Sequence, residues 1–280
     1  MEAALRHAAA ALSGHAISGS LEAQVLLAEV LHVPRPWILA HGEARLTASE
    51  ADSFLERISR LAAGEPLAYI LGWWEFYGLR FRVEPSVMIP RPETETLVEH
   101  ALAFLWARPS RRQAIDVGIG AGCIGLTLAV HVEDLKLAAT DISRKALRIA
   151  RENARALDVN HRIHWLQADL MAPFVGRFDL ICANLPYLPR DRLPSLEVSK
   201  HEPRLALDGG EKGVASIRRL LAQLPNHLAP GGWALLEIDE GQADEARRDA
   251  QSQLPGCSAR VEHDLSGRDR LLIIERGEEG

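Results

Sequence analysis

Long hydrophobic runs, cysteines and an excess of positive charge are all scarce in this sequence of 280 residues. No apolar run reaches the roughly 18 residues that a membrane-spanning helix needs, so we expect no transmembrane segment. The opening residues Met1–Arg6 lack the basic-then-apolar order of a signal peptide. We therefore expect a cytoplasmic protein that is not bound to a membrane.

Only three cysteines are present, and they are isolated from one another at Cys123, Cys182 and Cys257. An odd number without metal-ligand spacing indicates neither a disulfide framework nor a zinc site. His161 and His164 lie on or just before the edge of a predicted strand, and we expect no metal there either. A reducing compartment is the simplest interpretation.

The net charge is −6, and the negative charge is spread along the chain. One basic run lies between residues 144 and 155, but its helical spacing favours a solvated helix face. The sequence therefore argues against direct binding of nucleic acid. With 47% hydrophobic residues, the chain can bury a full core, and its length suggests one large domain and a smaller one.

Residues 1 to about 72 are predicted to form the smaller, helical domain. One helix is expected to begin at the cap residue Ser20 and end at Leu31. Its predicted inner face consists of Leu21, Val25, Ala28 and Leu31. No pair of residues in this region suggests chemistry, so we interpret it as a recognition or docking module.

A second helix of this region is predicted from Thr47-Ala48-Ser49-Glu50, which has the spacing of a capping box. Its expected inner residues are Phe54, Ile58 and Leu61. Gly64-Glu65-Pro66 is expected to end it.

A β-hairpin is predicted next, because Leu79–Val83 alternates strictly and Gly78 separates it from the aromatic run Trp73–Tyr77. After the hairpin, Ile89-Pro90-Arg91-Pro92-Glu93-Thr94-Glu95 places two prolines around an arginine. Pro92 suits the first turn of a helix that we expect to reach Trp106. We interpret this segment either as a rigid linker or as one wall of a ligand-binding site.

From residue 113 onward, strands and helices alternate, which is typical of an α/β fold with a parallel sheet. The predicted strands are 114–117, 135–140, 163–166, 178–182, 233–238, 258–261 and 271–274. The predicted helices are 123–130, 144–157, 215–224 and 241–253, and residues 205–213 are expected to form a loop.

A glycine-rich turn, Gly118-Ile119-Gly120-Ala121-Gly122, follows the first of these strands. Such a turn lets the backbone approach a nucleotide-like ligand closely. Asp141 ends the next strand, where its carboxylate can bind both ribose hydroxyls. The turn predicts a nucleotide-like ligand. Two ligand classes are consistent with it, a dinucleotide and S-adenosylmethionine.

The dinucleotide alternative rests on Gly120-Ala121-Gly122-Cys123-Ile124-Gly125, which matches G-x-G-x-x-G. Against it, Gly120 does not follow its strand directly, and Asp116 would bring a carboxylate close to a pyrophosphate. The same carboxylate would favour a ligand with an ammonium and a sulfonium group. We therefore favour S-adenosylmethionine.

A second polar segment, Ala183-Asn184-Leu185-Pro186-Tyr187, follows the apolar strand 178–182. In open α/β sheets, ligands bind at the carboxyl ends of strands. The Asn184 side chain and the next main-chain carbonyl can accept both hydrogens of a planar NH₂ group. The adjacent Tyr187 ring can cover the flat face of that group. The alternative is a turn that merely ends the strand.

The chain resembles the release-factor glutamine N5-methyltransferases, the HemK-like branch of the class I methyltransferases. The matching stretches are Gly64–Gly72, Glu75–Gly78, Ile89–Glu95, Asp116–Gly122, Asn184–Tyr187, Glu202–Leu207 and Gly267–Arg270. The resemblance implies a Rossmann-like, mostly parallel seven-stranded sheet. It also implies a helical substrate-docking domain (1–72), a β-hairpin linker (73–90) and a catalytic domain (91–280).

The resemblance also implies roles for the residues of the two polar segments. Gly118, Ile119, Gly120, Ala121 and Gly122 would flank the methionine part of S-adenosylmethionine, Asp141 would hold the ribose, and Asp169 and Leu170 would border the adenine. Asn184, Leu185, Pro186 and Tyr187 would form the catalytic segment, in which Asn184 would contact both S-adenosylmethionine and the acceptor. Glu237 is interpreted as structural, and Arg91 and Glu95 are not expected to contact the ligands.

One residue departs from the family pattern Asn-Pro-Pro-Tyr, because Leu185 stands where the first proline is usual. The carbonyl of residue 185 is retained, whereas the stiffness of proline is lost.

The predicted reaction is methylation of the glutamine side-chain nitrogen in the Gly-Gly-Gln motif of peptide-chain release factors. A ribosomal-protein glutamine methyltransferase and a DNA or RNA adenine N6-methyltransferase remain alternatives. So do a non-catalytic donor-binding subunit and a nicotinamide oxidoreductase, although the Asn184/Tyr187 pair argues against both.

Overall fold

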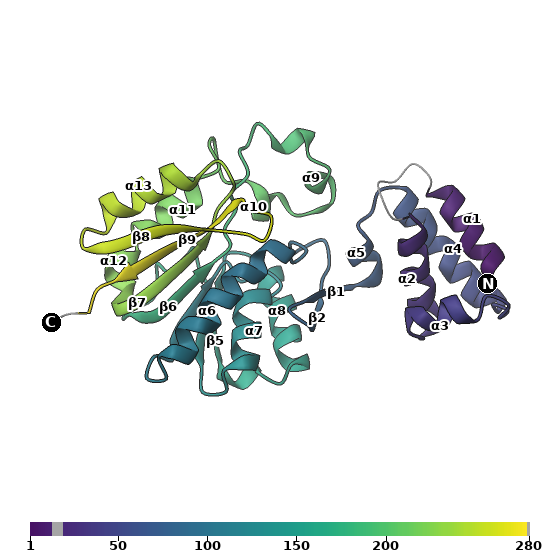
Figure 1. The fold of residues 1–280 in the computed structure, drawn as a ribbon, viewed down its shortest axis with the longest axis horizontal. Coiled ribbons are helices and arrows are strands. Elements are labelled where there is room, and N and C mark those ends of the chain that lie inside the picture. The colour runs from purple at the N-terminus through teal and green to yellow at the C-terminus, as the bar shows by residue number, and fades with distance from the viewer. Residues whose placement is uncertain (13–18, 279–280) are drawn as a thin grey trace. The chain divides into compact units, whose positions relative to one another are not determined.

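The computed structural model describes residues 1–12 and 19–278 of the chain. It divides into two compact units, Met1–Trp73 and Trp74–Gly280 (Figure 1). Within the described residues, no helix has the length and apolar character needed to cross a membrane.

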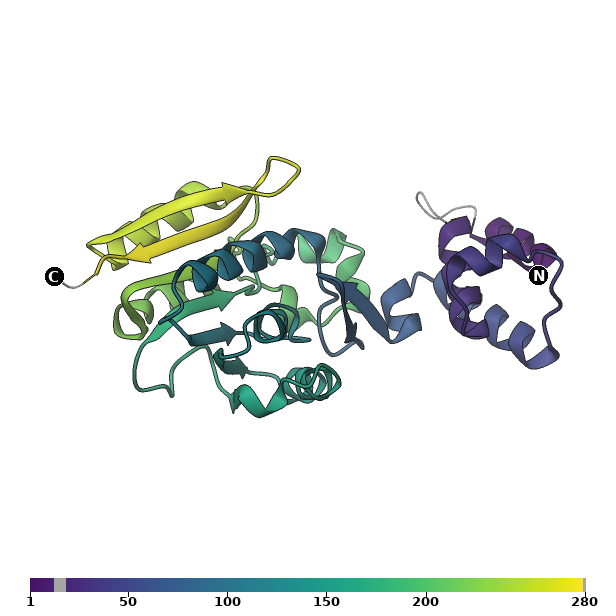
Figure 2. The ribbon, with the colours of Figure 1, turned by 60° about the horizontal axis from the view of Figure 1, so that its bottom comes forward.

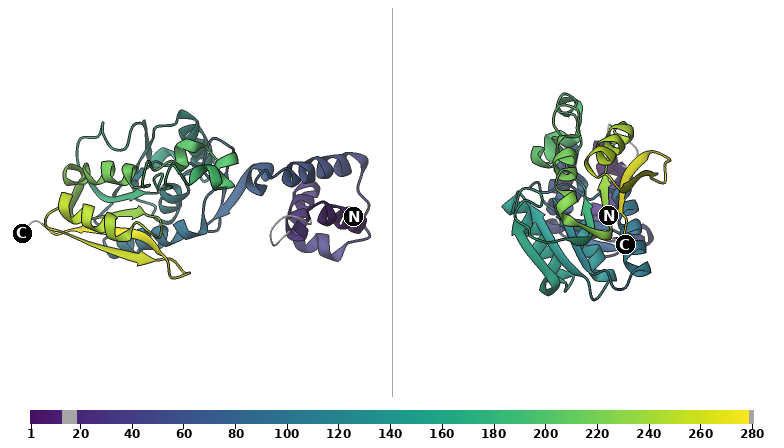
Figure 3. Two further views of the ribbon diagram at one scale, coloured as in Figure 1. Left: turned by 90° about the horizontal axis from the view of Figure 1, so that it is seen from above. Right: turned by 90° about the vertical axis from the view of Figure 1, so that its left-hand side faces the viewer.

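The first unit is a bundle of helices around its own core (Figure 3). Its helices are α1 (Glu2–Ala11), α2 (Gly19–Leu31), α3 (Arg35–Ala40), α4 (Ala48–Ala62) and α5 (Leu67–Leu71). Leu26, Phe54 and Ile58 are buried at its centre. The capping box that starts α4 is confirmed: the Glu50 backbone N–H donates to Thr47 Oγ1 (3.3 Å), and the Thr47 backbone N–H donates to Glu50 Oε2 (2.7 Å).

The prediction for α2 was wrong in two respects. The helix includes Gly19, so Ser20 lies in a helical turn and does not cap it. Of the predicted inner face only Ala28 is buried, while Leu21 is 42% exposed. The buried positions are Ala23, Leu26, Leu27 and Ala28. Because α2 is apolar on most sides, its sequence period does not single out the buried face.

The predicted β-hairpin is present as β1 (Trp73–Phe76) and β2 (Leu79–Arg82). Tyr77 and Gly78 both have positive φ angles, +51° and +71°, as a two-residue hairpin turn of the primed type requires. Glu95 Oε1 accepts a hydrogen bond from the Tyr77 backbone N–H (2.9 Å), which fixes the hairpin turn to the following helix.

The second unit is built on a seven-stranded sheet, which confirms the predicted α/β fold with a mostly parallel sheet (Figure 2). Its strands are β3 (Gln113–Val117), β4 (Lys136–Asp141), β5 (Ile163–Gln167), β6 (Phe178–Ala183), β7 (Leu228–Glu237), β8 (Cys257–His263) and β9 (Asp269–Arg276). Their order is β5-β4-β3-β6-β7-β9-β8. Only β9 runs antiparallel to its two neighbours.

Helices cover both faces of this sheet, each over its own hydrophobic core. One face carries α6 (Glu95–Ala107), α7 (Cys123–His131) and α8 (Arg144–Ala156). The other carries α11 (Ala215–Leu221), α12 (Leu224–His227) and α13 (Ala243–Gln253). Short helical turns occupy η1 (Pro92–Thr94), η2 (Asn160–Arg162), η3 (Leu193–Ser195), α9 (Val198–His201) and α10 (Arg204–Leu207).

Three predicted boundaries need correction. The loop predicted from residue 205 begins only after α10, because Pro203 precedes a single helical turn at Arg204–Leu207. The strand predicted from Trp233 begins at Leu228 and includes two glycines. The helix predicted over 215–224 ends at Leu221.

The strand order reverses between β3 and β6, because β4 and β5 lie on one side of β3 whereas β6 and β7 lie on the other. The two connections therefore leave the sheet in opposite directions and open a crevice at the carboxyl ends of the two strands. Gly118 follows β3 and Asn184 follows β6 at this edge.

Candidate active site

A cavity of about 350 Å³ lies in the second unit at the carboxyl ends of its central strands. Ten of the predicted site residues line it: Gly118, Ile119, Gly120, Ala121, Asp141, Asp169, Leu170, Asn184, Leu185 and Pro186. Gly122 and Tyr187, also predicted, are not among its lining residues. The fold thus brings the two predicted segments to one cavity.

The glycine turn is shaped by backbone hydrogen bonds to β4. The N–H groups of Gly118 and Ile119 both donate to the Thr140 carbonyl, at 2.9 and 2.8 Å. Gly118 and Gly120 adopt φ angles of +76° and +56°, which disfavour any residue with a side chain. At Gly118 a Cβ atom would also lie 3.0 Å from Leu185 Cδ2, so a side chain here would crowd the cavity wall.

Asp141 stands at the end of β4 with both carboxylate oxygens facing backbone donors. Oδ2 accepts from the Gly120 N–H (3.0 Å), and Oδ1 accepts from the Ser143 N–H (2.8 Å). Burial raises the pKa of Asp141, although backbone hydrogen bonds act in the opposite direction. Each carboxylate oxygen has two lone pairs, so the group still has acceptor capacity for two hydroxyl groups.

Asp116 does not have the position that our argument for a cationic ligand required. Its side chain is 1% exposed and does not line the cavity. Its Oδ2 accepts a hydrogen bond from the Gly125 N–H (2.7 Å) in the first turn of α7. A Cβ at residue 125 would come within 2.9 Å of this oxygen, which explains the third glycine of the apparent dinucleotide fingerprint.

Asn153 of α8 supports the glycine turn from behind and was missed from the sequence. Its Nδ2 donates to the Ala121 carbonyl (2.8 Å) and to the Arg82 carbonyl (3.1 Å). Its Oδ1 accepts from the Arg82 N–H (2.7 Å). One buried amide therefore holds the glycine turn and strand β2 together.

Asp169 and Leu170 follow β5 on another side of the cavity. The Asp169 carboxylate forms an ion pair with Arg219 of α11, which also lines the cavity. Leu170 has a positive φ of +54°, uncommon for a residue with a side chain, and is 9% exposed. Ile142, a lining residue that the sequence analysis missed, is 51% exposed beside Asp141.

Asn184 is half-buried at the end of β6, and its amide is held by a hydrogen bond. Its Nδ2 donates to Thr94 Oγ1 (3.1 Å), while the Thr94 hydroxyl donates to Glu237 Oε2 (2.7 Å). Because the Asn184 amide nitrogen is engaged by Thr94, the Oδ1 atom is left to accept hydrogen bonds from a ligand.

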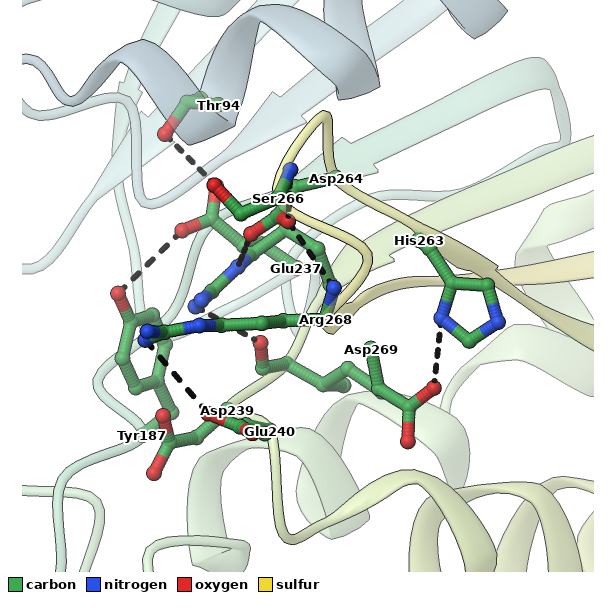
Figure 4. Close-up of polar contacts among 12 residues, drawn as sticks. Thr94, Tyr187, Glu237, Asp239, Glu240, His263, Asp264, Ser266, Arg268 and Asp269 are labelled. Atoms are coloured by element: carbon green, nitrogen blue, oxygen red, sulfur yellow. Dashed lines mark hydrogen bonds and ion pairs between the residues drawn. The ribbon is translucent and has the colours of Figure 1, made fainter.

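The residues after Asn184 have different surroundings. Leu185 is 5% exposed and belongs to the hydrophobic core of the α11–α13 face. The Tyr187 hydroxyl donates to Glu237 Oε1 (3.3 Å), so Tyr187 and Thr94 both point toward Glu237 (Figure 4). Gly122, with φ +95°, caps α7 and packs against Leu126.

The segment before α6 forms a second wall of the cavity through Pro90 and Thr94. Arg91 forms an ion pair with Glu202, whose Oε2 also accepts from the Ile89 N–H (3.2 Å). Neither Arg91 nor Glu95 lines the cavity.

Among the lining residues that the sequence did not predict individually are Thr94, Ile142 and Leu205, although the segment of Thr94 was considered as a wall of the site. Ile142 had a local signal, because it directly follows the acid at the end of β4. Thr94 lies within a matched motif, but its partners are distant in the chain, so the sequence alone could not assign it a contact.

Two family descriptions match the chain. Residues 3–72 match "PrmC N-terminal domain", and residues 94–193 match "Methyltransferase small domain". The release factor glutamine methyltransferase of Moorella thermoacetica is 42% identical over 261 residues, which cover 92% of each chain. The chain belongs to the release factor glutamine methyltransferase family.

A second relative in this family extends the similarity. The release factor glutamine methyltransferase of Koribacter versatilis is 39% identical over 279 residues, 97% of this chain and 95% of the relative. The crystal structure of a methyltransferase from Pyrococcus furiosus has 19% identity and a TM-score of 0.53, and the match covers 79% of this chain and 98% of that one. This likeness concerns the fold, and the class I methyltransferase fold predicted for this family member is confirmed.

Proposed function

We propose that this enzyme transfers a methyl group from S-adenosylmethionine to the side-chain amide nitrogen of the glutamine in the Gly-Gly-Gln motif of peptide-chain release factors. The observation that carries the proposal is the Asn184 amide beside the cavity, with its nitrogen bound to Thr94. The family similarity along nearly the full chain supports release factors as the substrate.

The chemistry of the residues that line the cavity supports S-adenosylmethionine as the methyl donor. We propose that Gly118, Ile119, Gly120 and Ala121 bind the methionine part, because Gly118 and Gly120 have no side chain and the Ile119 side chain is buried in the hydrophobic core. Asp141 would hold the ribose hydroxyls, and Leu170 and Ile142 would supply apolar contacts to the adenine with Asp169 at its edge. The bound donor supplies an electrophilic methyl group on a positively charged sulfur.

An amide nitrogen is a poor nucleophile, because its lone pair is conjugated with the carbonyl group. We propose that Asn184 Oδ1 and the Leu185 carbonyl accept the two hydrogens of the glutamine NH₂ group and so turn its nitrogen toward the donor. This orientation is the main contribution of the protein, because it holds the reacting atoms at about 3–3.5 Å.

The other predicted residues have supporting roles in this proposal. Pro186 restricts the backbone of the loop, since its ring fixes φ. That the Tyr187 ring covers the amide plane stays a prediction, and its bond to Glu237 fixes the hydroxyl end of the ring. The nitrogen loses its proton to solvent after the transfer.

The helical unit is proposed to dock the release factor. Residues 1–72 would contact the factor away from the glutamine loop, and the hairpin over 73–90 would link them to the catalytic part over 91–280. The intact factor should therefore be a far better substrate than a Gly-Gly-Gln peptide. Deletion of residues 1–72 should raise the apparent KM for the factor and leave donor affinity unchanged.

The proposed compartment is the cytoplasm, where release factors act on ribosomes. Direct nucleic-acid binding is not part of the proposed function, because the chain carries a net charge of −6 without a basic arm.

Mass spectrometry of purified release factor, incubated with enzyme and donor, tests the proposal. The expected result is a gain of one CH₂ unit on the glutamine of Gly-Gly-Gln. Asn184→Ala should lose methyl transfer while its donor affinity stays within about tenfold of wild type. Methylation found only on a ribosomal protein or on adenine would overturn the proposed substrate.

A further inference from the structure

A chain of hydrogen bonds, buried at its centre, connects three segments of the second unit behind the catalytic loop. Asn184, which follows β6, donates to Thr94 in η1, and Thr94 donates to Glu237 at the end of β7. Tyr187 reaches the other oxygen of the same carboxyl group (Figure 4). Thr94 and Glu237 are each 1% exposed, so water does not compete for these bonds.

The single proton of the Thr94 hydroxyl decides which way the Asn184 amide faces. An ionised Glu237 can only accept, so the hydroxyl proton points to Glu237 and a lone pair remains for the Asn184 NH₂ group. A protonated Glu237 can instead donate to Thr94. The threonine would then donate to Asn184, which favours the flipped amide with its nitrogen toward the ligand.

The charge of Glu237 depends on its neighbours. Burial raises the pKa of Glu237 to about 7, and Glu93 also raises it, whereas the bonds from Thr94 and Tyr187 and the charge of Arg270 lower it. Arg270 on β9 is held by Asp264, whose Oδ2 lies 3.4 Å from Arg270 Nε. The titratable and charged groups around this site are Glu93, Cys123, Tyr187 and Arg270, with Arg91 and Asp239 acting on Tyr187.

We propose that Thr94 and Glu237 are positioning residues that lock the Asn184 amide with its oxygen toward the acceptor glutamine. This inference rests on the proposed role of Asn184 as acceptor of the glutamine N–H groups. It assigns a function to Thr94, which lies in the Pro-Arg-Pro-Glu-Thr-Glu segment. It also changes the interpretation of Glu237 from a structural residue to one that controls the orientation of the loop.

Two substitutions of Thr94 test the proposal. Thr94→Val keeps the shape but removes the hydroxyl, and we expect kcat to fall by about tenfold or more, the effect of one lost orienting hydrogen bond. Thr94→Ser keeps the hydroxyl and should restore kcat to near the wild-type value. Donor affinity, measured by calorimetry, should be unchanged in both variants.

The control is Thr127→Val, the same substitution at another fully buried threonine, whose hydroxyl donates within α7 to the Cys123 carbonyl (2.6 Å). Its kcat should equal that of the wild type. A Thr94→Val enzyme with the kcat of this control would overturn the proposal.

The pH dependence of kcat distinguishes a positioning role of Glu237 from a purely structural one, which would not change it. Wild-type kcat should fall as the pH is lowered through about 7, because Glu237 then takes up a proton. Glu237→Gln, which does not ionise, should have a lower kcat at pH 8 and no such decline. An unchanged decline in this variant would refute the role of Glu237.

A spectroscopic measurement separates this proposal from the proposed function. The NMR signal of the ¹⁵N-labelled Asn184 side-chain amide should change its chemical shift with pH in the wild type and not in Thr94→Val. This result does not depend on which substrate the enzyme methylates. A pH-independent signal in the wild type would contradict the proposal that Thr94 and Glu237 position the Asn184 amide. A wild-type enzyme that methylates no release factor refutes only the proposed function.

Discussion

Replacement of Asn153 by alanine should weaken both the second unit and its donor site. The side chain is 2% exposed and makes three hydrogen bonds to backbone groups of Arg82 and Ala121. Alanine keeps the helix α8, because it has the highest helix propensity. The effect of the substitution therefore comes from the three lost bonds.

The magnitude follows from which backbone groups lose their partner. Arg82 is exposed, so water can replace the amide at its N–H and carbonyl groups. Ala121 is 3% exposed, and an unpaired buried carbonyl costs about 1–3 kcal/mol. The replacement of the two Asn153 bonds at Arg82 by bonds to water adds to this cost. The free energy of unfolding should therefore fall by about 3 kcal/mol in total. Donor affinity should fall by about tenfold, since Ala121 lines the cavity.

Urea unfolding followed by circular dichroism measures the first effect, and calorimetry with the donor measures the second. Asn226→Ala, at an exposed position next to β7, is the matched control and should change stability by less than about 0.5 kcal/mol. If the two variants unfold at the same urea concentration, Asn153 does not support the glycine turn.

Three further substitutions have defined outcomes. Asp141→Ala should reduce donor affinity by about 1.5–3 kcal/mol in calorimetry, and unchanged affinity would remove Asp141 from the site. Burial raises the pKa of Asp116 from 3.8 to about 7, so the native state binds the proton more tightly than the unfolded state does. Wild-type stability should therefore fall by up to about 4 kcal/mol as the pH rises from about 4 to 7, and Asp116→Asn should lack this part of the slope in urea unfolding at several pH values. If stability falls equally with pH in both proteins, the raised pKa does not belong to Asp116. Leu185→Pro should keep turnover on the release factor but lose about 1–2 kcal/mol of stability, because buried methyl groups are removed; a collapse of turnover would mean that the loop requires the leucine.

The sequence by itself determined the features that depend on neighbouring residues. The capping box of α4 and the β-hairpin of β1 and β2 are short-range structures, so their residues are sufficient to predict them. The alternation of strands and helices predicted the parallel sheet, and the carboxyl ends of its strands predicted the place of the cavity.

The tertiary structure alone decided which groups meet across long separations in the chain. Asn184 lies 90 positions from Thr94, and Glu237 lies 143 positions from it, so no local pattern connects them. It also turned Asp116 away from the cavity: its Oδ2 accepts from the Gly125 N–H group of α7, and its Oδ1 is buried without a hydrogen-bond partner among the described residues. A hydrogen bond requires the position and direction of both partners, and for distant residues only the packed fold supplies them.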